Sequence, residues 1–187
     1  AIAREKDVEG IHPENLGRIV QGRIDLAPST PLAAFHLIRS TGIDLYGKEV
    51  VVVGQSQIVG RPMALMLLEE YSTVTVCHIG TRDIGEYTRR ADLLVVAAGV
   101  PGLIKGTMIK PGAFVVDIGI NRIIQRTPDG SPVLDASGAP MRVTVGDVDF
   151  DSASKVAGYL TPVPGGVGPL TVTMLLKNIV SAATKMR

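Results

Sequence analysis

The stretch that decides the fold runs Glu49-Val50-Val51-Val52-Val53-Gly54-Gln55-Ser56-Gln57-Ile58-Val59-Gly60-Arg61-Pro62. Its first half is almost entirely valine, which favours strands and is too uniformly apolar for a sheet face exposed to water. Its second half is rich in glycine and leads into the apolar residues of 63–68 at helical spacing. We therefore expect a central strand covered on both sides, then a glycine turn and a helix.

The same alternation of short β-branched runs and helical stretches continues along the chain, which is typical of βαβ units around a parallel sheet. The further expected strands are Val74–Cys77, Leu93–Ala98, Phe114–Ile118 and Arg142–Val145, and the expected crossover helices are Ile58–Tyr71 and Asp83–Arg90. The pattern predicts an α/β fold: a Rossmann-like doubly wound parallel sheet of five strands with flanking helices.

The two ends of the chain do not follow this alternation. Residues 1–28 are polar and loop-like, and Pro31–Ser40 is expected to form a helix that begins at proline and ends near Gly42. Pro169–Arg187 has the apolar spacing of an amphipathic helix. Within the domain, Gln125–Pro140 contains Pro-Asp-Gly and further prolines, which predicts a hairpin or loop.

Composition narrows the class of protein. The 187 residues are 45% apolar, with 19 Lys and Arg against 18 Asp and Glu, and a net charge of +1 gives no field to attract a nucleic acid. The single cysteine, Cys77, fits a reducing compartment, so we expect a cytoplasmic protein. We also expect no membrane contact, because no apolar run approaches about 18 residues and the N-terminus lacks a signal-peptide core.

The glycine segment after the valine strand occupies the position of a dinucleotide-binding loop. Its glycines allow a tight turn and close backbone approach, and free N–H groups at the helix N-terminus would face a pyrophosphate. The spacing departs from G-x-G-x-x-G, since Ser56 stands at the second glycine and Gly60 comes six residues after Gly54. A turn that only packs strand against helix is the alternative.

The end of the second strand bears on which nucleotide is bound. An NAD-binding fold usually presents an acidic residue there, but this chain has Cys77-His78-Ile79-Gly80-Thr81-Arg82 and no carboxylate before Asp83. The cation and the missing acid favour a 2′-phosphate, and so NADP. Arg82 as an ordinary solvated residue remains the alternative.

A third informative segment precedes the last helix and reads Thr161-Pro162-Val163-Pro164-Gly165-Gly166-Val167-Gly168-Pro169-Leu170-Thr171. Its prolines and glycines suit a loop that presents backbone groups to a ligand, or simply a turn with Pro169 at the first helical position. Asp117-Ile118-Gly119-Ile120-Asn121 ends the fourth strand, at the carboxyl edge where such sheets bind ligands.

Other kinds of site lack support. Cys77 and His78 are neighbours on a strand, so their side chains point to opposite faces and cannot pair directly. His12, His36 and His78 have no metal-ligand spacing, and we expect no metal site. No G-x-x-x-x-G-K-[ST] phosphate loop occurs.

Six ordered motifs, spanning essentially the whole chain, resemble the signatures of the methylenetetrahydrofolate dehydrogenase/cyclohydrolase family. They are Lys6-Asp7-Val8-Glu9-Gly10-Ile11-His12-Pro13, Pro28-Ser29-Thr30-Pro31, Gly54-x-Ser56-x-Ile58-Val59-Gly60-x-Pro62, Lys110-Pro111-Gly112-Ala113 with Asp117-x-Gly119-Ile120-Asn121, Gly146-Asp147-Val148, and Pro162-Val163-Pro164-Gly165-Gly166-Val167-Gly168-Pro169. The resemblance implies oxidation of methylenetetrahydrofolate with NADP (in some members NAD), hydrolysis of the methenyl product to formyltetrahydrofolate, and a place in one-carbon metabolism and purine biosynthesis.

The resemblance also implies site residues. The cofactor would contact Gly54, Gln55, Ser56, Gly60, Arg61, Pro62, Arg82 and Ile120, and folate would contact Glu9, Pro164, Gly165, Gly166, Val167, Gly168 and Pro169. Gln55 stands where the family most often has arginine, which leaves Arg82 or Arg61 as substitute cations and NAD possible. Glu9 replaces the family's substrate-binding aspartate, with the charge retained on a longer arm.

The family's Tyr-x-x-x-Lys pair and Gln-Leu-Pro segment, which precede the Lys-Asp-Val motif, do not occur in this sequence. The catalytic residues are therefore unassigned, and we expect a chain that binds nucleotide but lacks the catalytic half of a longer enzyme, expected to be a homodimer, acting on tetrahydrofolate derivatives. Residues 1–30 would be a remnant of the catalytic domain, 31–160 the nucleotide-binding domain and 161–187 the folate loop and return helix. A non-catalytic nucleotide-binding or regulatory module is the alternative.

Overall fold

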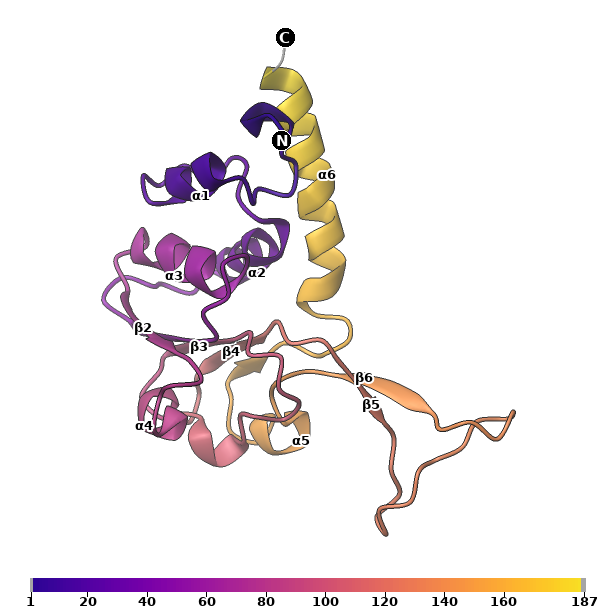
Figure 1. Ribbon diagram of the computed structural model, residues 1–187. Helices are drawn as coiled ribbons and strands as arrows, with labels where there is room; N and C mark the ends of the chain where they lie inside the picture. The colour runs from indigo at the N-terminus through magenta and orange to yellow at the C-terminus, as the bar shows by residue number, and fades with distance from the viewer. Residues whose placement is uncertain (1, 186–187) are drawn as a thin grey trace.

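A computed structural model describes residues 2–185, and its centre is a five-stranded parallel sheet in the order β2-β1-β3-β4-β7 (Figure 1). The sheet strands are β1 (Glu49–Val53), β2 (Thr73–Cys77), β3 (Leu93–Val96), β4 (Phe114–Asp117) and β7 (Tyr159–Leu160). The α-helices are α1 (Pro13–Ile19), α2 (Ser29–Ser40), α3 (Gly60–Leu68), α4 (Ile84–Thr88), α5 (Phe150–Ala153) and α6 (Val167–Lys185), and two 3-10 turns are η1 (Arg4–Lys6) and η2 (Gly106–Met108).

The sheet is buried on both faces, as the valine run predicted. Val50 and Val52 belong to a core with α2, α3 and α6, whereas Val51 and Val53 belong to a second core with α4 and the 104–115 region. Successive strand residues point to opposite faces, so each face receives alternate valines. Figure 1 shows α2 and α3 on one side of the sheet and α4 and α5 on the other. The doubly wound α/β prediction is confirmed.

The strand order creates a switch point between β1 and β3. From β1 the chain crosses to β2 on one side, and it then returns to β3 on the other side of β1. Connections leaving β1 and β3 at their carboxyl ends therefore diverge, and a crevice opens between them where doubly wound sheets bind ligands. The glycine segment beginning at Gly54 leaves β1 at this point.

The expected fifth strand forms, but the prediction that it belongs to the parallel sheet was wrong. Arg142–Val145 is β6, which pairs antiparallel with β5 (Asn121–Ile124) in a separate two-stranded sheet, and β7 completes the parallel sheet. Arg142–Val145 alternates polar and apolar residues and is half-buried at most, unlike the continuous apolar run of a covered strand. With the turns of 125–140, these strands form an arm that projects from the body (Figure 1).

Several helix boundaries also differ from expectation. Residues 13–19, expected as loop, form α1, with Pro13 in the first turn and the His12 ring accepting a hydrogen bond from the Glu14 N–H. Helix α2 begins at Ser29, α3 spans only 60–68, and α6 begins at Val167. The expected helix runs on to Met186 and Arg187, which lie outside the described residues.

Helix α6 packs along α2 and carries a buried asparagine. The Asn178 side chain donates hydrogen bonds to the carbonyl oxygens of Val8 and Ala27, at 3.0 and 2.9 Å. Within residues 2–185, the segment Val167–Thr184 is also long and apolar enough, by length and mean hydropathy of 1.2, to span a membrane. No uninterrupted apolar run reaches this length, because threonine, serine, asparagine and lysine interrupt the segment, but its larger apolar residues keep the average hydropathy high.

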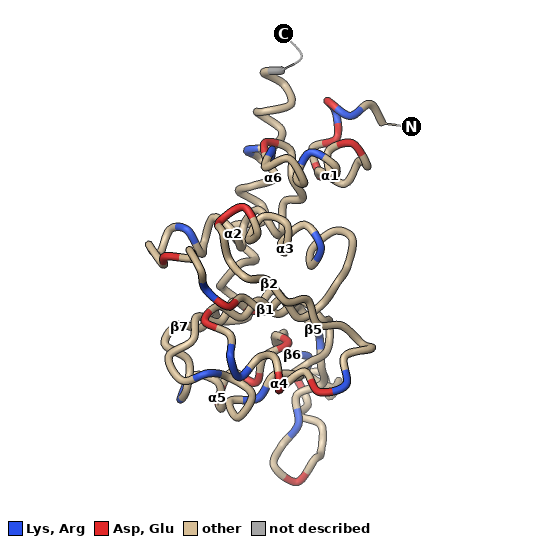
Figure 2. The backbone as a smooth tube through the Cα atoms, turned by 90° about the vertical axis from the view of Figure 1, so that its left-hand side faces the viewer, with Lys and Arg blue, Asp and Glu red and all other residues tan. Residues whose placement is uncertain are grey.

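Charged residues of both signs are distributed over the molecule (Figure 2). Basic and acidic positions are scattered around the sheet, in agreement with the net charge of +1, whereas the charged residues of α6 are Lys177 and Lys185.

Candidate functional site

A pocket of about 440 Å³ lies at the switch point between β1 and β3. Its lining residues come from the carboxyl ends of three adjacent strands and the loops that follow them. They are Val53, Gly54, Gln55, Ser56, His78, Ile79, Thr81, Ile84, Ala97, Ala98, Val100 and Leu103. Three of the expected cofactor residues, Gly54, Gln55 and Ser56, are thus brought together, in the position where the fold binds nucleotides.

Two glycines of this loop allow backbones to approach closely. A Cβ atom at Gly54 would lie 2.1 Å from the carbonyl oxygen of Ala97, and Gly54 has a φ of +116°, which side chains rarely adopt. A Cβ atom at Gly60 would lie 2.0 Å from the Gly54 carbonyl oxygen. Glycine is therefore required at both positions to seat the loop between β3 and α3.

Ser56 accepts hydrogen bonds from N–H groups that were expected to be free. Its hydroxyl oxygen accepts from the N–H groups of Val59 and Gly60, at 3.2 and 3.4 Å, and its carbonyl oxygen accepts from Arg61 at 3.1 Å. The expectation of free N–H groups at the start of α3 was therefore wrong for these three positions. A serine in place of the second glycine explains the difference at Val59 and Gly60, because its hydroxyl accepts both N–H groups, whereas the Arg61 N–H bonds the backbone carbonyl.

The remaining expected cofactor residues lie outside the lining of this pocket. Gly60 and Pro62 are buried in α3, while Arg61 and Arg82 are exposed. Arg82 directly follows Thr81, which lines the pocket and whose hydroxyl oxygen accepts the His78 N–H at 2.9 Å. Arg82 is thus the exposed cation beside the pocket, whereas Ile120 lines a different pocket.

Sequence reasoning missed several residues that line the switch-point pocket. His78 and Ile79 follow β2, and the His78 ring accepts the Gly80 N–H at 3.0 Å, so the ring is held in place while Ile79 is fully exposed. Ala97 and Ala98 follow β3. The sequence predicted Ala97 and Ala98 as the last residues of a strand, but β3 ends at Val96, which leaves both in the loop that lines the pocket.

A second pocket, of about 330 Å³, lies beside the start of α6. It is lined by Thr30, Asp117, Ile118, Gly119, Ile120, Thr144, Pro162, Val163, Pro164, Gly165, Gly166, Val167, Gly168, Pro169, Thr171 and Val172. All the expected folate residues of 164–169 are therefore gathered here, together with Thr30 from the start of α2. The lining is largely apolar side chains and backbone, which suits a flat, partly apolar ligand.

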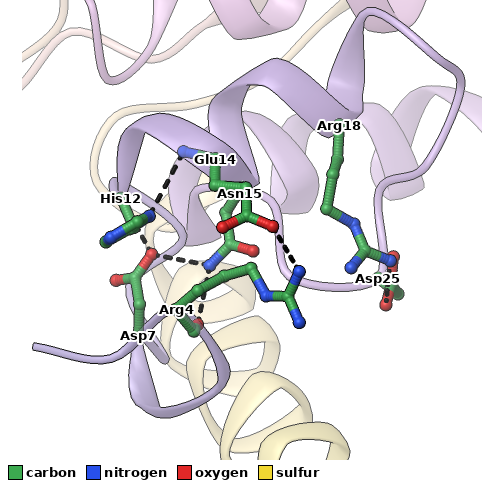
Figure 3. A network of polar contacts seen from close by, with 7 residues as sticks. All are labelled: Arg4, Asp7, His12, Glu14, Asn15, Arg18 and Asp25. Carbon is green, nitrogen blue, oxygen red and sulfur yellow. Dashed lines mark hydrogen bonds and ion pairs between the residues drawn. The ribbon is translucent and has the colours of Figure 1, made fainter.

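Glu9, the remaining expected folate residue, lies in an N-terminal segment held by polar contacts (Figure 3). Buried Asp7 accepts hydrogen bonds from the His12 N–H at 2.7 Å and the Asn15 amide at 2.9 Å, and Arg4 pairs with Glu14. Glu9 is exposed, and the Ser29 hydroxyl lies 3.5 Å from its carboxylate. The loop that carries Glu9 is thus anchored next to the segment that contributes Thr30.

Two buried carboxylates lie at the ends of β4 and β6. Asp117 accepts from the N–H groups of Gly119, Asp147 and Val148, at 2.9–3.1 Å. Burial, with a smaller contribution from neighbouring Asp147, raises the pKa of Asp117 to about 6 against the opposing effect of these three donors. Both aspartates lie in motifs quoted from the sequence, but their contact across 30 residues was not foreseen.

Neither a metal centre nor a reactive thiol is apparent. Residues 2–185 contain no group of three or more His, Cys, Asp or Glu side chains that could hold a metal ion. Cys77 is buried, and burial raises the pKa of its thiol, which disfavours the thiolate.

Comparison with known proteins finds one family that matches the chain over most of its length. Residues 28–187 match the family model described as tetrahydrofolate dehydrogenase/cyclohydrolase, NAD(P)-binding domain. The bifunctional protein FolD of Acetivibrio thermocellus is 51% identical over 183 residues, which are 98% of this chain and 59% of that protein. The chain thus spans about 60% of the length of the curated relatives it matches.

Solved structures give the same result. The bifunctional enzyme FolD of Campylobacter jejuni is 48% identical with a TM-score of 0.86, covering all of this chain and 61% of that one. The Trypanosoma brucei enzyme, solved with NADP and an inhibitor, is 43% identical with a TM-score of 0.85, covering 99% of this chain and 60% of that one. The chain therefore belongs to the tetrahydrofolate dehydrogenase/cyclohydrolase family, and its residues 28–187 are an NAD(P)-binding domain of that family.

Proposed function

We propose that this chain binds NADP in the switch-point pocket and a tetrahydrofolate derivative in the pocket beside α6. In the longer enzyme it would serve the oxidation of methylenetetrahydrofolate to methenyltetrahydrofolate and the hydrolysis of that product to formyltetrahydrofolate. The observation that carries the proposal is the loop from Gly54, which leaves β1 at the switch point and packs against the loop after β3. The relative from Trypanosoma brucei was solved with NADP.

The residues present fit a nucleotide at this position. The cradle formed by Gly54 and Gly60 has no room for a Cβ atom, which is typical of loops that bring backbone close to a pyrophosphate. Gln55 and Ser56 would contact the phosphates and ribose, and exposed Arg82 would pair with a 2′-phosphate. When bound, NADP supplies the acceptor for the hydride that leaves the substrate.

The chain's own part in the oxidation is to seat and orient the substrate. The loop 162–169 and Thr30 would hold the folate rings, and Glu9 would accept a hydrogen bond from a ring N–H group. The largely apolar lining would keep water from the reacting carbon. The hydrolysis needs a proton-transferring group, and the family's Tyr-x-x-x-Lys is absent from this sequence, so we propose that the chain alone completes neither reaction.

The second candidate is a non-catalytic nucleotide-binding or regulatory module with the same fold. The two candidates differ in whether the source gene encodes about 100 further residues upstream, the size of one small domain. Intact mass of the natural protein separates them. For the catalytic case we propose a cytoplasmic homodimer that supplies one-carbon units, including those for purine biosynthesis, without nucleic-acid or membrane partners.

Calorimetric titration of the purified chain with NADP and with NAD tests nucleotide binding. We expect saturable heat with NADP and weaker binding of NAD, because exposed Arg82 and Arg61 can pair with the 2′-phosphate that NAD lacks. Absence of heat with both nucleotides at millimolar concentration would contradict the proposal.

Cofactor preference is tested by Gln55→Arg. A cation at the pocket edge pairs with a 2′-phosphate that only NADP carries, so we expect the ratio of NADP to NAD affinity to rise about tenfold, roughly one charge-assisted hydrogen bond. Gln57→Arg is the matched control, since Gln57 is exposed and does not line the pocket. Equal ratios in the two variants would show that position 55 is remote from the 2′-phosphate.

A further inference from the structure

Asp147 is a buried carboxylate that lies between the two pockets and has no role in the reaction described above. It is fully buried, and it follows β6, next to Asp117 at the end of β4. Charged side chains are rarely buried unless every acceptor position is used. The groups that donate hydrogen bonds to Asp147 therefore identify the segments that it keeps in place.

One oxygen of Asp147 holds the wall of the switch-point pocket. Its Oδ2 accepts from the N–H groups of Ala98 and Gly99, at 2.6 and 2.8 Å. Ala98 lines the pocket, and the adjacent Ala97 carbonyl is the group against which Gly54 packs. Short bonds from two backbone donors to one carboxylate are strong. The loop after β3, and with it the seat of the glycine loop, is thus fixed by Asp147.

The other oxygen holds the segment next to the second pocket. Oδ1 of Asp147 accepts from the Asn121 side-chain amide at 2.8 Å. A Cβ atom at Gly119 would lie 2.2 Å from the Asp147 carboxyl carbon, so Gly119 packs directly on this carboxylate. Gly119 and Ile120 line the second pocket. Asp117 is packed against a glycine in the same way, because a Cβ atom at Gly146 would lie 1.8 Å from Oδ2 of Asp117.

We propose that Asp147 is a positioning residue that fixes the loop 97–100 relative to Gly119–Asn121, and so fixes NADP relative to the folate substrate. All three of its side-chain hydrogen bonds end on these two loops, one of which lines each pocket. The inference rests on the proposed function, since it names the residue that joins the two proposed sites.

A swap of donor and acceptor tests this role. In Asp147→Asn the new amide would face the Asn121 amide, donor against donor, and we expect NADP affinity of the chain to fall about tenfold. Adding Asn121→Asp reverses the polarity of that contact and restores the pair, so we expect the double variant to return to within about threefold of the wild type. Asp151→Asn removes the same charge from an exposed residue on α5 and is the matched control.

Two measurements are made on each variant: NADP affinity by calorimetry, and amide hydrogen exchange at Ala98 and Gly99 in the chain without nucleotide. We expect Asp147→Asn to speed exchange at these two amides and the double variant to slow it again. A role in folding alone would lower the unfolding temperature of Asp147→Asn while leaving the NADP affinity of the folded chain unchanged.

The outcomes separate the inference from the proposed function. Wild-type affinity and wild-type exchange in Asp147→Asn would overturn the inference and leave NADP binding intact. A wild-type chain that fails to bind NADP would overturn the proposed function, and this inference with it. If Asp147→Asn does not fold, the milder Asn121→Ala decides: reduced NADP affinity supports the role of the pair, and unchanged affinity contradicts it.

Discussion

Gly54 is the residue on which the nucleotide loop depends. Its φ of +116° and the 2.1 Å approach of a Cβ to the Ala97 carbonyl oxygen act together against any side chain. We expect Gly54→Ala to lower the free energy of unfolding by about 3 kcal/mol, roughly 1 from the backbone conformation and 1–3 from the overpacking. Urea unfolding measures it.

Gly47→Ala is the control for this prediction. Gly47 also has a positive φ, of +70°, but no atom lies within 4 Å of its Cβ position. We expect a loss of about 1 kcal/mol, from the backbone conformation alone. Equal losses in the two variants would show that the close approach of Gly54 to β3 has no energetic weight.

Asp117 gives the folded chain a pH dependence of definite sign. Its pKa is raised to about 6 by burial, whereas an unfolded aspartate has a pKa of about 3.9. Between these values the folded state binds more protons, so stability falls as the pH rises from about 4 to 6, by about 3 kcal/mol in total. Below both values the two states are protonated alike, and above both the loss is complete.

The measurement is urea unfolding of the wild type and of Asp117→Asn between pH 4 and 7. The variant has no titrating group at this position. The unfolding free energy of the wild type minus that of the variant should therefore fall as the pH rises. Asp151→Asn controls for the loss of an exposed carboxylate. Parallel pH profiles for wild type and Asp117→Asn would contradict the assignment.

At the scale of elements, the sequence predicts best where a covered strand meets a helix. Val50–Val53 and the apolar residues of α3 carry a strong local pattern, and both elements formed as expected. β7 has only two residues, and α1 is a short polar helix, so neither has enough apolar periodicity to be recognised. Arg142–Val145 was recognised as a strand but not as part of an antiparallel arm, because partner choice is not local.

The candidate site likewise contains residues that a local pattern predicts and residues that it does not. Gly54, Gln55 and Ser56 follow one strand and were predicted together from local spacing. Ala98 and Asp147 are joined by a 2.6 Å hydrogen bond across 49 positions, and no local pattern indicates which loop a carboxylate will reach. Such contacts depend on the order of strands in the sheet, which the sequence leaves open.

Helix α6 exposes an apolar stripe on its side away from α2. Val172, Leu176, Ile179 and Val180 have 61, 59, 43 and 65% of their surface accessible and fall at helical spacing. Leu175, between these positions in the sequence, is half-buried and does not belong to the stripe. A patch of this kind promotes association.

We therefore expect the isolated chain to associate in a concentration-dependent manner in light scattering, and Leu176→Glu with Val180→Glu to abolish it. Thr173→Glu with Thr184→Glu adds the same charge to exposed polar positions of α6 and should leave association unchanged. Wild-type chain that stays monomeric at every concentration, with full amide protection of α6, would count against this prediction.

At the scale of the whole molecule, two pockets meet at the carboxyl edge of one sheet. The switch-point pocket lies where β1 and β3 diverge, and the second pocket lies between the end of β4 and the start of α6. Asp117 lines the second pocket, and Asp147 accepts hydrogen bonds from loops beside each pocket. The fold thus brings the proposed nucleotide loop and the proposed folate loop, over 100 residues apart in the chain, to the same edge of the sheet.

Binding of NADP in the switch-point pocket is tested most directly by backbone chemical shifts of the labelled chain during NADP titration. We expect the large shifts to cluster at residues 54–60, 78–82 and 97–100, on three loops distant in sequence. Saturable shifts confined to other regions, or none at millimolar NADP, would contradict it.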